Sequence, residues 1–357
     1  MKRGNRGAWI FGLPRQGLAF ITNVIREKGT RKRLAKKNFQ RMMVKSSSFK
    51  KPIYVLLYHP WMDGFQECFA VHLSWLRENK FESIPLGDLL HYLKGEEVLI
   101  PERPIVITLD DGSIENYTVA YPLLKKYRFI GTVFAPTTQK YVRKSGKDWW
   151  KEVEEKGTLR IESHSHTHSL IFVSNRIEDF YMGKTPNLEP YVKGLDKRYG
   201  APIFGLGYEL VSQRFIPNKE LMDQCVDYVK EQGGGVLFKR EDWKEKLFKI
   251  MLKYREDRGE YETKEERGKR IREELKISKT IIQETIGNGK EVHFFAYPFG
   301  AYDLDLIEYL KETGYNGAFT TDPGGNWKGD DPFLIKRMTI LKEDSFSGLP
   351  HILKEYL

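Results

Sequence analysis

Apolar residues fall along this chain in two kinds of segment: short uninterrupted runs, and longer stretches with apolar positions three and four residues apart. The first kind is typical of strands buried on both faces, and the second is typical of amphipathic helices. The runs predict strands at residues 53–59, 105–109, 129–135, 159–162, 292–296, 317–320 and 334–339. The spacing predicts helices after residue 65 and at residues 116–127, 148–155, 265–286 and 304–312. Strands that alternate with helices in this way predict an α/β fold with a parallel sheet or barrel.

The alternation is interrupted once, from about residue 174 to residue 264. This segment combines scattered Gly and Pro with charged helical sequence, so we interpret it as an insertion rather than another repeat of strand and helix. The body is expected at residues 52–357, after an N-terminal extension of residues 1–51.

Positive charge is concentrated in that extension. Residues 1–51 hold 15 Lys and Arg and one acid, Glu27, whereas the other residues hold 44 basic and 48 acidic side chains. A basic segment of this kind suits contact with acidic lipid headgroups or nucleic acid. The body is nearly neutral and carries no recognisable nucleic-acid-binding motif, so we expect no nucleic-acid partner.

No stretch of this sequence is long and apolar enough to predict a membrane-spanning helix. The nearest candidate, residues 9–25, is interrupted by Pro14 and Arg15, and no small-residue cleavage site follows it. It is either an interfacial segment with basic flanks or a solvated extension. Without a clear signal peptide, we expect a cytoplasmic or membrane-associated protein rather than a secreted one. The two cysteines, Cys68 and Cys225, match no zinc-binding spacing and are expected to be reduced packing residues.

Two carboxylates stand at the end of the predicted strand 105–109. Asp110 and Asp111 are followed by Gly112, which allows a sharp turn. In α/β folds, catalytic groups lie at the carboxyl ends of strands. Neighbouring side chains on an extended chain point to opposite sides, so one carboxylate could bind a metal while the other accepts a proton. The structural alternative is a helix N-cap with a second acid in the first turn.

Three of the eight histidines lie within five residues, at His164, His166 and His168. If this segment turns helically, His164 and His168 share one face and His166 faces away. Two imidazoles and a carboxylate suit a divalent metal, and Asp111 is the candidate third ligand.

Two further segments end predicted strands. Residues 295–300 combine aromatic residues with Pro and Gly, which is typical of a rigid rim or of a simple turn over core aromatics. His59 closes the strand at residues 53–59, where a lone histidine is either structural or functional.

Taken in order, these segments resemble the motifs of the polysaccharide deacetylase family (carbohydrate esterase family 4, the NodB-like homology domain). The matching motifs are Asp110-Asp111-Gly112, His164-Ser165-x-x-His168 and Tyr297-Pro298-Phe299-Gly300. The resemblance covers residues 52–172 and 265–345. The strand that ends in Tyr58-His59 is similar to the one that opens the circularly permuted poly-β-1,6-N-acetylglucosamine deacetylase branch.

The resemblance implies a deformed (β/α)7 barrel, here with a long insertion and a basic N-terminal extension. It implies a metal-dependent hydrolase that removes N-acetyl groups from an N-acetylhexosamine polysaccharide, such as an exopolysaccharide, or from a glycolipid. One divalent metal, zinc by preference with cobalt or nickel as substitutes, would be held by Asp111, His164 and His168.

The resemblance also assigns the proton transfers. Asp110 would be the general base, His59 would be the general acid that protonates the leaving amine, and the backbone N–H of Phe299 would stabilise the oxyanion. Separately from the resemblance, the aromatic residues Tyr297, Trp149 and Trp150 are candidates for sugar stacking, with core packing as the alternative.

Two departures from the family pattern bear on catalysis. Ala296 stands where many members carry an arginine that tethers the base, so either another cation holds Asp110 or the base is tuned differently. The acidic residue that usually orients the acid histidine is not obvious in this sequence, and Asp322 is the candidate for orienting His59. The departure at Ala296 leaves room for an alternative function, a catalytically weak or inactive carbohydrate-binding relative of the deacetylases.

Overall fold

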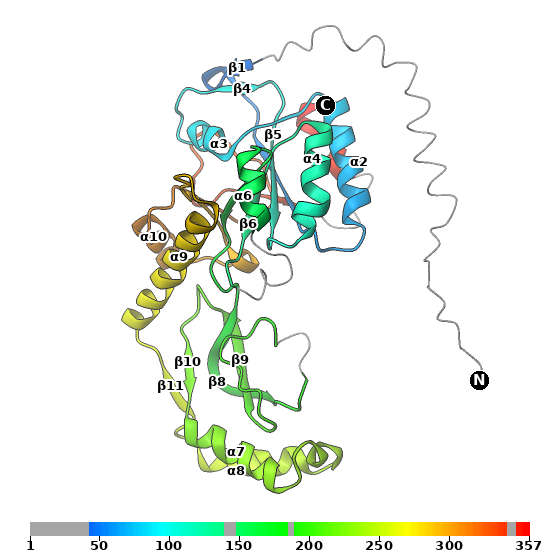
Figure 1. The fold of residues 1–357 in the computed structure, drawn as a ribbon. Coiled ribbons are helices and arrows are strands. Elements are labelled where there is room, and N and C mark those ends of the chain that lie inside the picture. Colours follow the sequence, from blue (N-terminus) through cyan, green and yellow to red (C-terminus); the bar gives the residue numbers. More distant parts are fainter. Residues whose placement is uncertain (1–42, 139–147, 185–188, 341–347) are drawn as a thin grey trace, which may run out of the picture. The chain divides into compact units, whose positions relative to one another are not determined.

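A curved sheet of parallel strands forms the centre of the protein in this computed structural model, which describes residues 43–138, 148–184, 189–340 and 348–357 (Figure 1). The strands are mostly apolar and buried because helices and the barrel interior cover both faces. Their order across the sheet is β13 (Gly317–Phe319), β12 (Phe294–Ala296), β7 (Leu159–Ser163), β6 (Gly131–Ala135), β5 (Pro104–Asp110), β2 (Tyr54–Tyr58) and β14 (Met338–Thr339). The short β3 (Glu82–Ser83) also pairs with β5.

The two ends of this sheet approach each other through irregular pairing. Phe319, at the end of β13, forms an isolated parallel bridge with Ile335, which precedes β14. The N–H of Thr320 donates to the carbonyl of Ile335 over 2.8 Å. The predicted strand 334–339 is therefore regular only at β14. This arrangement is the deformed α/β barrel that the resemblance implies.

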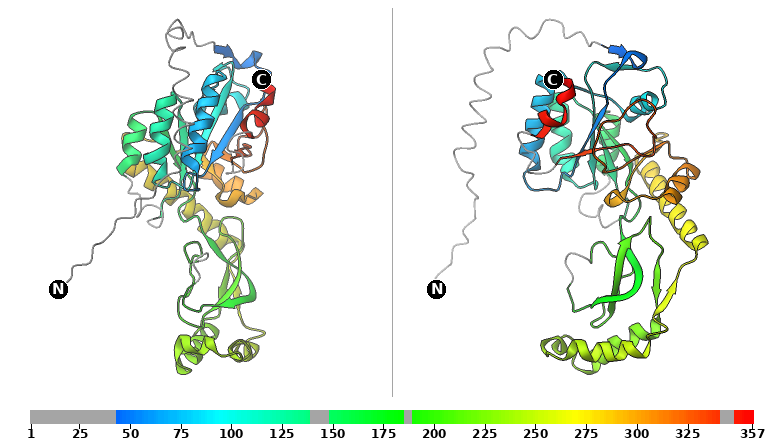
Figure 2. Two further views of the ribbon diagram at one scale, coloured as in Figure 1. Left: turned by 90° about the vertical axis from the view of Figure 1, so that its right-hand side faces the viewer. Right: turned by 180° about the vertical axis from the view of Figure 1, so that it is seen from behind.

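Helices pack against the outside of the strands, as Figures 1 and 2 show. Their bounds are α2 (Phe65–Glu78), α3 (Leu86–Leu93), α4 (Tyr121–Tyr127), α6 (Asp148–Glu155), α9 (Lys264–Ile286) and α10 (Leu304–Glu312). On α2, the predicted apolar face is buried, with Phe69 and Leu73 fully covered. The helix predicted at residues 116–127 is split into a π-helical turn, η3 (Asn116–Ala120), and α4.

The helix α9 begins at a capping box. The Thr263 hydroxyl accepts from the N–H of Glu266, and the Glu266 carboxylate accepts from the N–H of Thr263. Both groups would otherwise be unpaired at the helix start, which explains why the helix begins there.

The segment between β7 and α9 has a hydrophobic core of its own. It contains a hairpin of β8 (Leu170–Phe180) and β9 (Pro202–Tyr208), a second antiparallel pair, β10 (Phe215–Pro217) and β11 (Gly259–Tyr261), and the helical elements α7 (Lys219–Glu231), η4 (Gly234–Lys239) and α8 (Trp243–Lys253). Its core includes Phe172, Phe204, Phe215 and the free thiol Cys225. The hairpin starts at Leu170, four residues before the expected insertion.

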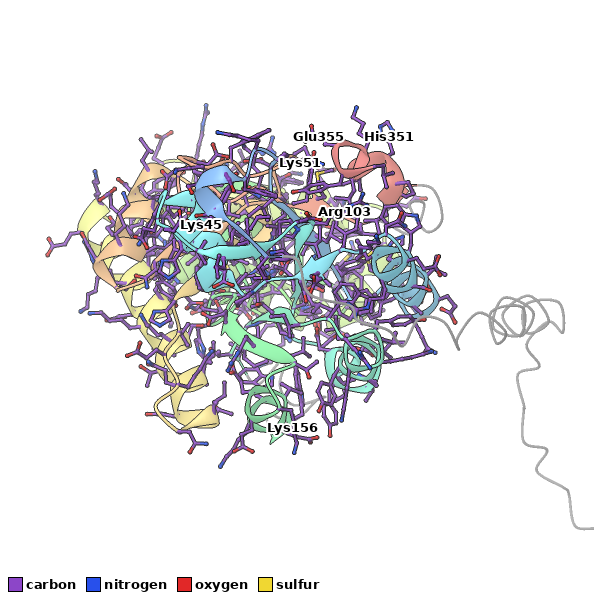
Figure 3. All side chains as sticks on the ribbon, turned by 90° about the horizontal axis from the view of Figure 1, so that it is seen from above. Lys45, Lys51, Arg103, Lys156, His351 and Glu355 are labelled. Atoms are coloured by element: carbon purple, nitrogen blue, oxygen red, sulfur yellow. The ribbon has the colours of Figure 1, made fainter. Side chains whose placement is uncertain are left out.

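Smaller elements lie at the amino ends of the barrel strands and near the C-terminus. They are β1 (Met43–Lys45), η2 (Ser46–Ser48), β4 (Leu99–Pro101), α11 (Gly348–Ile352) and η7 (Lys354–Tyr356). Lys45, Lys51 and Arg103 belong to this end, which Figure 3 views from above. Because β1 pairs with β4, the body includes residues before the expected start at Pro52. Within the described residues, no helix is both long enough and apolar enough to cross a membrane.

Candidate active site

The first carboxylates of the site stand where β5 ends. Asp110 is the last residue of β5, and the chain then turns through left-handed backbone at Asp111 (φ 72°) and Gly112 (φ 60°). A Cβ on Gly112 would lie 2.9 Å from the Cβ of Ala135, so the turn requires glycine. Since the chain is not extended at Asp111, the expected divergence of the two carboxylates is wrong. Both approach Nε2 of His164, Asp110 Oδ2 at 3.9 Å and Asp111 Oδ1 at 3.7 Å.

The histidine segment is a loop rather than the helical turn we expected. Ser165 (φ 66°) and His168 (φ 47°) both adopt left-handed backbone. The Ser165 hydroxyl accepts from the N–H of His168 over 2.9 Å, and the Ser165 carbonyl accepts from Ser278 of α9 over 3.0 Å. This bent loop brings the rings of His164 and His168 to a centroid separation of 4.7 Å. The two imidazoles therefore meet, as predicted, by a different backbone route.

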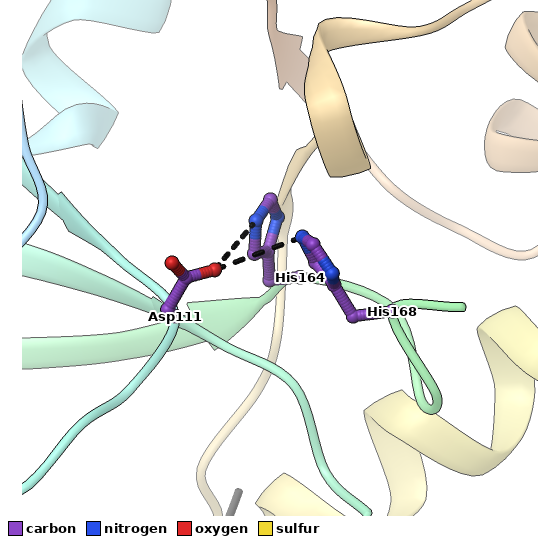
Figure 4. Close-up of side chains that lie close together, drawn as sticks. All are labelled: Asp111, His164 and His168. Carbon is purple, nitrogen blue, oxygen red and sulfur yellow. Dashed lines mark ion pairs between the residues drawn. The ribbon is translucent and has the colours of Figure 1, made fainter. Parts of the chain in front are cut away.

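Asp111, His164 and His168 converge on one point (Figure 4). Their ligand atoms all lie within 4.8 Å of one another, and Asp111 Oδ1 is 3.6 Å from Nε2 of His168. Zinc bonds to nitrogen and oxygen in a tetrahedral site place such ligand atoms about 3.4 Å apart. The three side chains therefore fit a single divalent ion with little rearrangement.

The protonation of the two imidazoles also suits metal binding. His164 Nδ1 lies 2.8 Å from the carbonyl oxygen of Ala296, which can only accept, so this nitrogen carries the proton and Nε2 presents its lone pair. Burial, together with the nearby His164, lowers the pKa of His168 to about 4, which keeps that ring neutral near neutral pH.

Asp110 is held by an arginine that the sequence analysis did not identify. Arg337, fully buried, donates from Nη1 and Nη2 to the two carboxylate oxygens of Asp110, each over 2.8 Å, and from Nε to the carbonyl of Thr320 over 2.7 Å. Burial alone would raise the pKa of Asp110, but the charge and hydrogen bonds of Arg337 oppose this most strongly, and the pKa of Asp110 lies below its ordinary value. Asp110 is therefore an ionised carboxylate inside a buried site.

The loop after β2 contributes His59 and Trp61. His59 directly follows β2, whose last residue, Tyr58, pairs with Leu109 of β5, so His59 lies at the same end of the barrel as the carboxylates. The indole Nε1 of Trp61 donates to Oδ2 of Asp111 over 2.6 Å, and the indole remains 57% exposed. Trp61 thus orients the carboxylate whose other oxygen faces the histidines. Its position two residues after His59 was the only signal for it in the sequence.

The segment after β12 places its two aromatic residues differently. Phe299 adopts left-handed backbone (φ 59°) in η5 (Pro298–Gly300), its side chain is 40% exposed, and its ring centroid lies 4.4 Å from that of His168. Tyr297 is fully buried and donates its hydroxyl to the carbonyl of Phe333 over 2.9 Å. The prediction that Tyr297 contacts substrate through its side chain is therefore wrong, because the ring packs in the core.

The remaining sequence candidates are buried or bond to residues outside the triad. Trp149 and Trp150 are buried, which fits the packing alternative rather than sugar stacking. The Asp322 carboxylate accepts from the hydroxyl of Tyr302 over 2.9 Å. His166 faces away, as expected, with Nδ1 2.8 Å from the hydroxyl of Thr137.

Comparisons with known proteins point to the same family that the sequence motifs resemble. The family model described as Polysaccharide deacetylase matches residues 100–184. Over 107 residues the chain is 29% identical to the poly-β-1,6-N-acetyl-D-glucosamine N-deacetylase of Staphylococcus aureus, an alignment that covers 28% of this chain and 36% of that protein. YxkH of Bacillus subtilis, assigned to the polysaccharide deacetylases, is 29% identical over 120 residues, which cover 32% of this chain and 42% of YxkH. The chain thus spans less than half the length of these curated relatives.

Solved structures share the fold over a larger part of the chain. The deacetylase domain of BpsB from Bordetella bronchiseptica superposes with a TM-score of 0.54 at 18% identity, covering 81% of this chain and 95% of that one. IcaB from Ammonifex degensii superposes with a TM-score of 0.52 at 17% identity, covering 83% and 94%. At these identities the likeness establishes the fold.

The fold is therefore the deformed parallel barrel of these solved structures, and in this chain an aspartate and two histidines meet at the carboxyl ends of its strands. Over residues 100–184 the sequence is similar to the polysaccharide deacetylase family, and the relatives of similar sequence include poly-β-1,6-N-acetyl-D-glucosamine N-deacetylases.

Proposed function

We propose that this protein is a metal-dependent hydrolase that removes N-acetyl groups from an N-acetylhexosamine polysaccharide or glycolipid and releases acetate. The observation that carries the proposal is the buried, ionised Asp110, which Arg337 holds beside the triad of Asp111, His164 and His168. A carboxylate in this position can accept a proton from water at neutral pH. The family and its named relatives support the amide of an N-acetylated sugar as the substrate.

Each side chain has a separate task in the proposed reaction. Asp111, His164 and His168 would hold one divalent ion, with zinc proposed and cobalt or nickel as substitutes. Such an ion supplies a Lewis acid that polarises the acetyl carbonyl and lowers the pKa of water. Asp110 takes the proton from the attacking water as the carbon–oxygen bond forms, and the backbone N–H of Phe299 donates to the developing oxyanion.

His59 completes the proposed proton transfers. It donates a proton to the nitrogen as the carbon–nitrogen bond breaks, so that a free amine and acetate leave. The acid and the base then come from different loops, after β2 and at the end of β5, which permits them to reach opposite sides of one amide. The complete set of Asp110, Arg337 and the triad favours turnover over the alternative of an inactive carbohydrate-binding relative.

Acetate release tests this proposal. The full chain, treated with chelator and then loaded with zinc, cobalt or nickel, is incubated with oligomers of poly-β-1,6-N-acetylglucosamine, chitooligosaccharides and an N-acetylated glycolipid. We expect Asp110→Asn to reduce release by at least about 10²-fold while the metal is retained. The matched control, Asp227→Asn on the exposed face of α7, should match the wild type. A metal-loaded wild-type protein that releases no acetate from any of the three substrates would overturn the proposal.

The membrane contact of the basic segment 1–51 and the cytoplasmic or membrane-associated location stay predictions, and residues 1–42 lie outside the described range.

A further inference from the structure

An exposed aromatic pair joins the metal triad to the insertion. Tyr208, the last residue of β9, stacks on Phe299 with ring centroids 5.0 Å apart and planes 25° apart. Phe299 in turn lies against His168. The two side chains are 44% and 40% exposed, so the pair is a surface feature and not part of the core. A continuous aromatic surface therefore leads away from a metal ligand.

The position of Tyr208 is fixed by its neighbour. Glu209 is 2% exposed and accepts hydrogen bonds from the hydroxyl of Thr167 over 2.5 Å and from Nζ of Lys193 over 2.7 Å. Its carbonyl accepts from Nη1 of Arg270 on α9 over 2.7 Å. Thr167 lies in the sequence between the two predicted histidine ligands. The buried carboxylate of Glu209 therefore links the chain at Tyr208 to the loop that carries those histidines.

The next residue, Leu210, packs into the apolar core of the barrel. Leu210 is 5% exposed and belongs to the same apolar core as the barrel strands. The end of β9 is thus tied to the barrel by a buried charge network and by core packing. Charged hydrogen bonds of this kind are short and directional, so they define where the Tyr208 ring stands relative to the site.

Exposed aromatic rings beside a glycan-processing site are suited to bind sugar rings. The C–H groups on one face of a pyranose carry partial positive charge, and they pack on the negatively charged face of an aromatic ring while apolar area leaves water. Among the described residues, Phe299 is the one aromatic ring against Tyr208, which leaves the other face of Tyr208 without a second ring.

We infer that Tyr208 and Phe299 form a binding subsite for the sugar unit next to the one that is deacetylated. This inference rests on the proposed function, and it narrows the substrate to a glycan chain rather than a single sugar. The insertion then acts as a recognition element that the barrel alone would lack, because it supplies Tyr208.

Chain-length dependence of Tyr208 variants tests the subsite. We expect Tyr208→Ala to raise KM about tenfold for a pentamer of poly-β-1,6-N-acetylglucosamine, and to change kcat/KM for the monosaccharide less than about twofold. Tyr208→Phe, which keeps the ring, should resemble the wild type. The matched control is Tyr261→Ala, because Tyr261 is an insertion tyrosine on β11 with a similar exposure of 46%.

A binding measurement separates failure of the subsite from failure of the proposed reaction. Calorimetric titration of the pentamer into the zinc-loaded Asp110→Asn protein, with and without Tyr208→Ala, should show about tenfold weaker binding in the double variant. An equal loss on pentamer and monosaccharide, or unchanged pentamer binding, would overturn the subsite. If wild-type turnover is absent but the tenfold binding difference is present, the subsite stands and the reaction does not.

Discussion

Replacing Arg337 removes the paired hydrogen bonds that hold the proposed general base, Asp110. Arg337→Met removes both 2.8 Å hydrogen bonds to Asp110 and leaves that carboxylate, 2% exposed, without its main counter-charge. Breaking a buried ion pair by removing one partner costs about 3–5 kcal/mol. We expect the free energy of unfolding to fall by that amount at pH 7, as measured by urea denaturation.

The effect on activity follows from the pKa of Asp110. Arg337 favours the ionised carboxylate, so its removal raises that pKa. A general base is active only when ionised. The acidic limb of the profile of kcat/KM against pH should therefore move to higher pH. Arg337→Lys keeps the charge but not the two-pronged geometry, and should give an intermediate shift.

Stability should depend on pH with a matching sign. Asp110 has a lower pKa in the folded protein than in the unfolded chain, so it stabilises the fold above the unfolded pKa of about 3.9, and this contribution is lost as the pH falls further. The stability difference between wild type and Arg337→Met should shrink on acidification. Arg240→Met, which breaks an exposed pair with Asp242, is the control for loss of an arginine. If Arg337→Met keeps the wild-type acidic limb and stability, Arg337 does not hold the base.

Two further predictions concern the support of the site. Trp61→Phe removes the indole N–H that donates to Asp111, and we expect the affinity for zinc to fall about tenfold in a chelator competition assay. The control is Trp327→Phe, at another exposed tryptophan. Unchanged affinity in Trp61→Phe would show that the indole does not orient the carboxylate. Burial alone would raise the pKa of Glu262, but hydrogen bonds from Arg270 outweigh burial and lower that pKa. Glu262→Gln should therefore reduce the free energy of unfolding by about 1.5–3 kcal/mol at pH 7. The reduction should become smaller as the pH falls through the native pKa of Glu262. An equal cost at pH 7 and pH 3 would contradict that assignment.

The regular elements could be predicted from sequence because their signals are local. The apolar runs gave β2, β5, β6 and β7, and the helical spacing gave α2, α6, α9 and α10 within a few residues. The strand predicted at residues 334–339 was too long. Its first half forms an isolated bridge, since the barrel closes irregularly there.

The metal ligands were also predictable, but their geometry was not. Asp111, His164 and His168 are dense in sequence, and the family motifs name them. Their approach depends on left-handed backbone at Asp111, Ser165 and His168, which no residue type there demands. The same limitation explains the wrong assignment of Tyr297, whose ring could face either the core or the substrate until the turn was known.

Long-range partners were beyond local reasoning. Arg337 lies 227 residues from Asp110 in sequence, so its role depends on the barrel bringing β14 beside β2 and β2 beside β5. Tyr208 lies in an insertion that the family motifs do not cover. The alanine at Ala296 left two possibilities open, another cation on Asp110 or a differently tuned base, and Arg337 is the cation that holds Asp110.

Metal content measures the central claim most directly. The purified full chain is stripped with chelator, dialysed against zinc and washed, and its zinc is then quantified by elemental analysis beside the variants His168→Gln and His166→Gln. We predict about one zinc per chain in the wild type and in His166→Gln, and strong loss in His168→Gln, because His168 faces Asp111 while His166 bonds to Thr137. A wild-type protein that retains no zinc, cobalt or nickel, or a His168→Gln protein that binds zinc as the wild type does, would contradict the account.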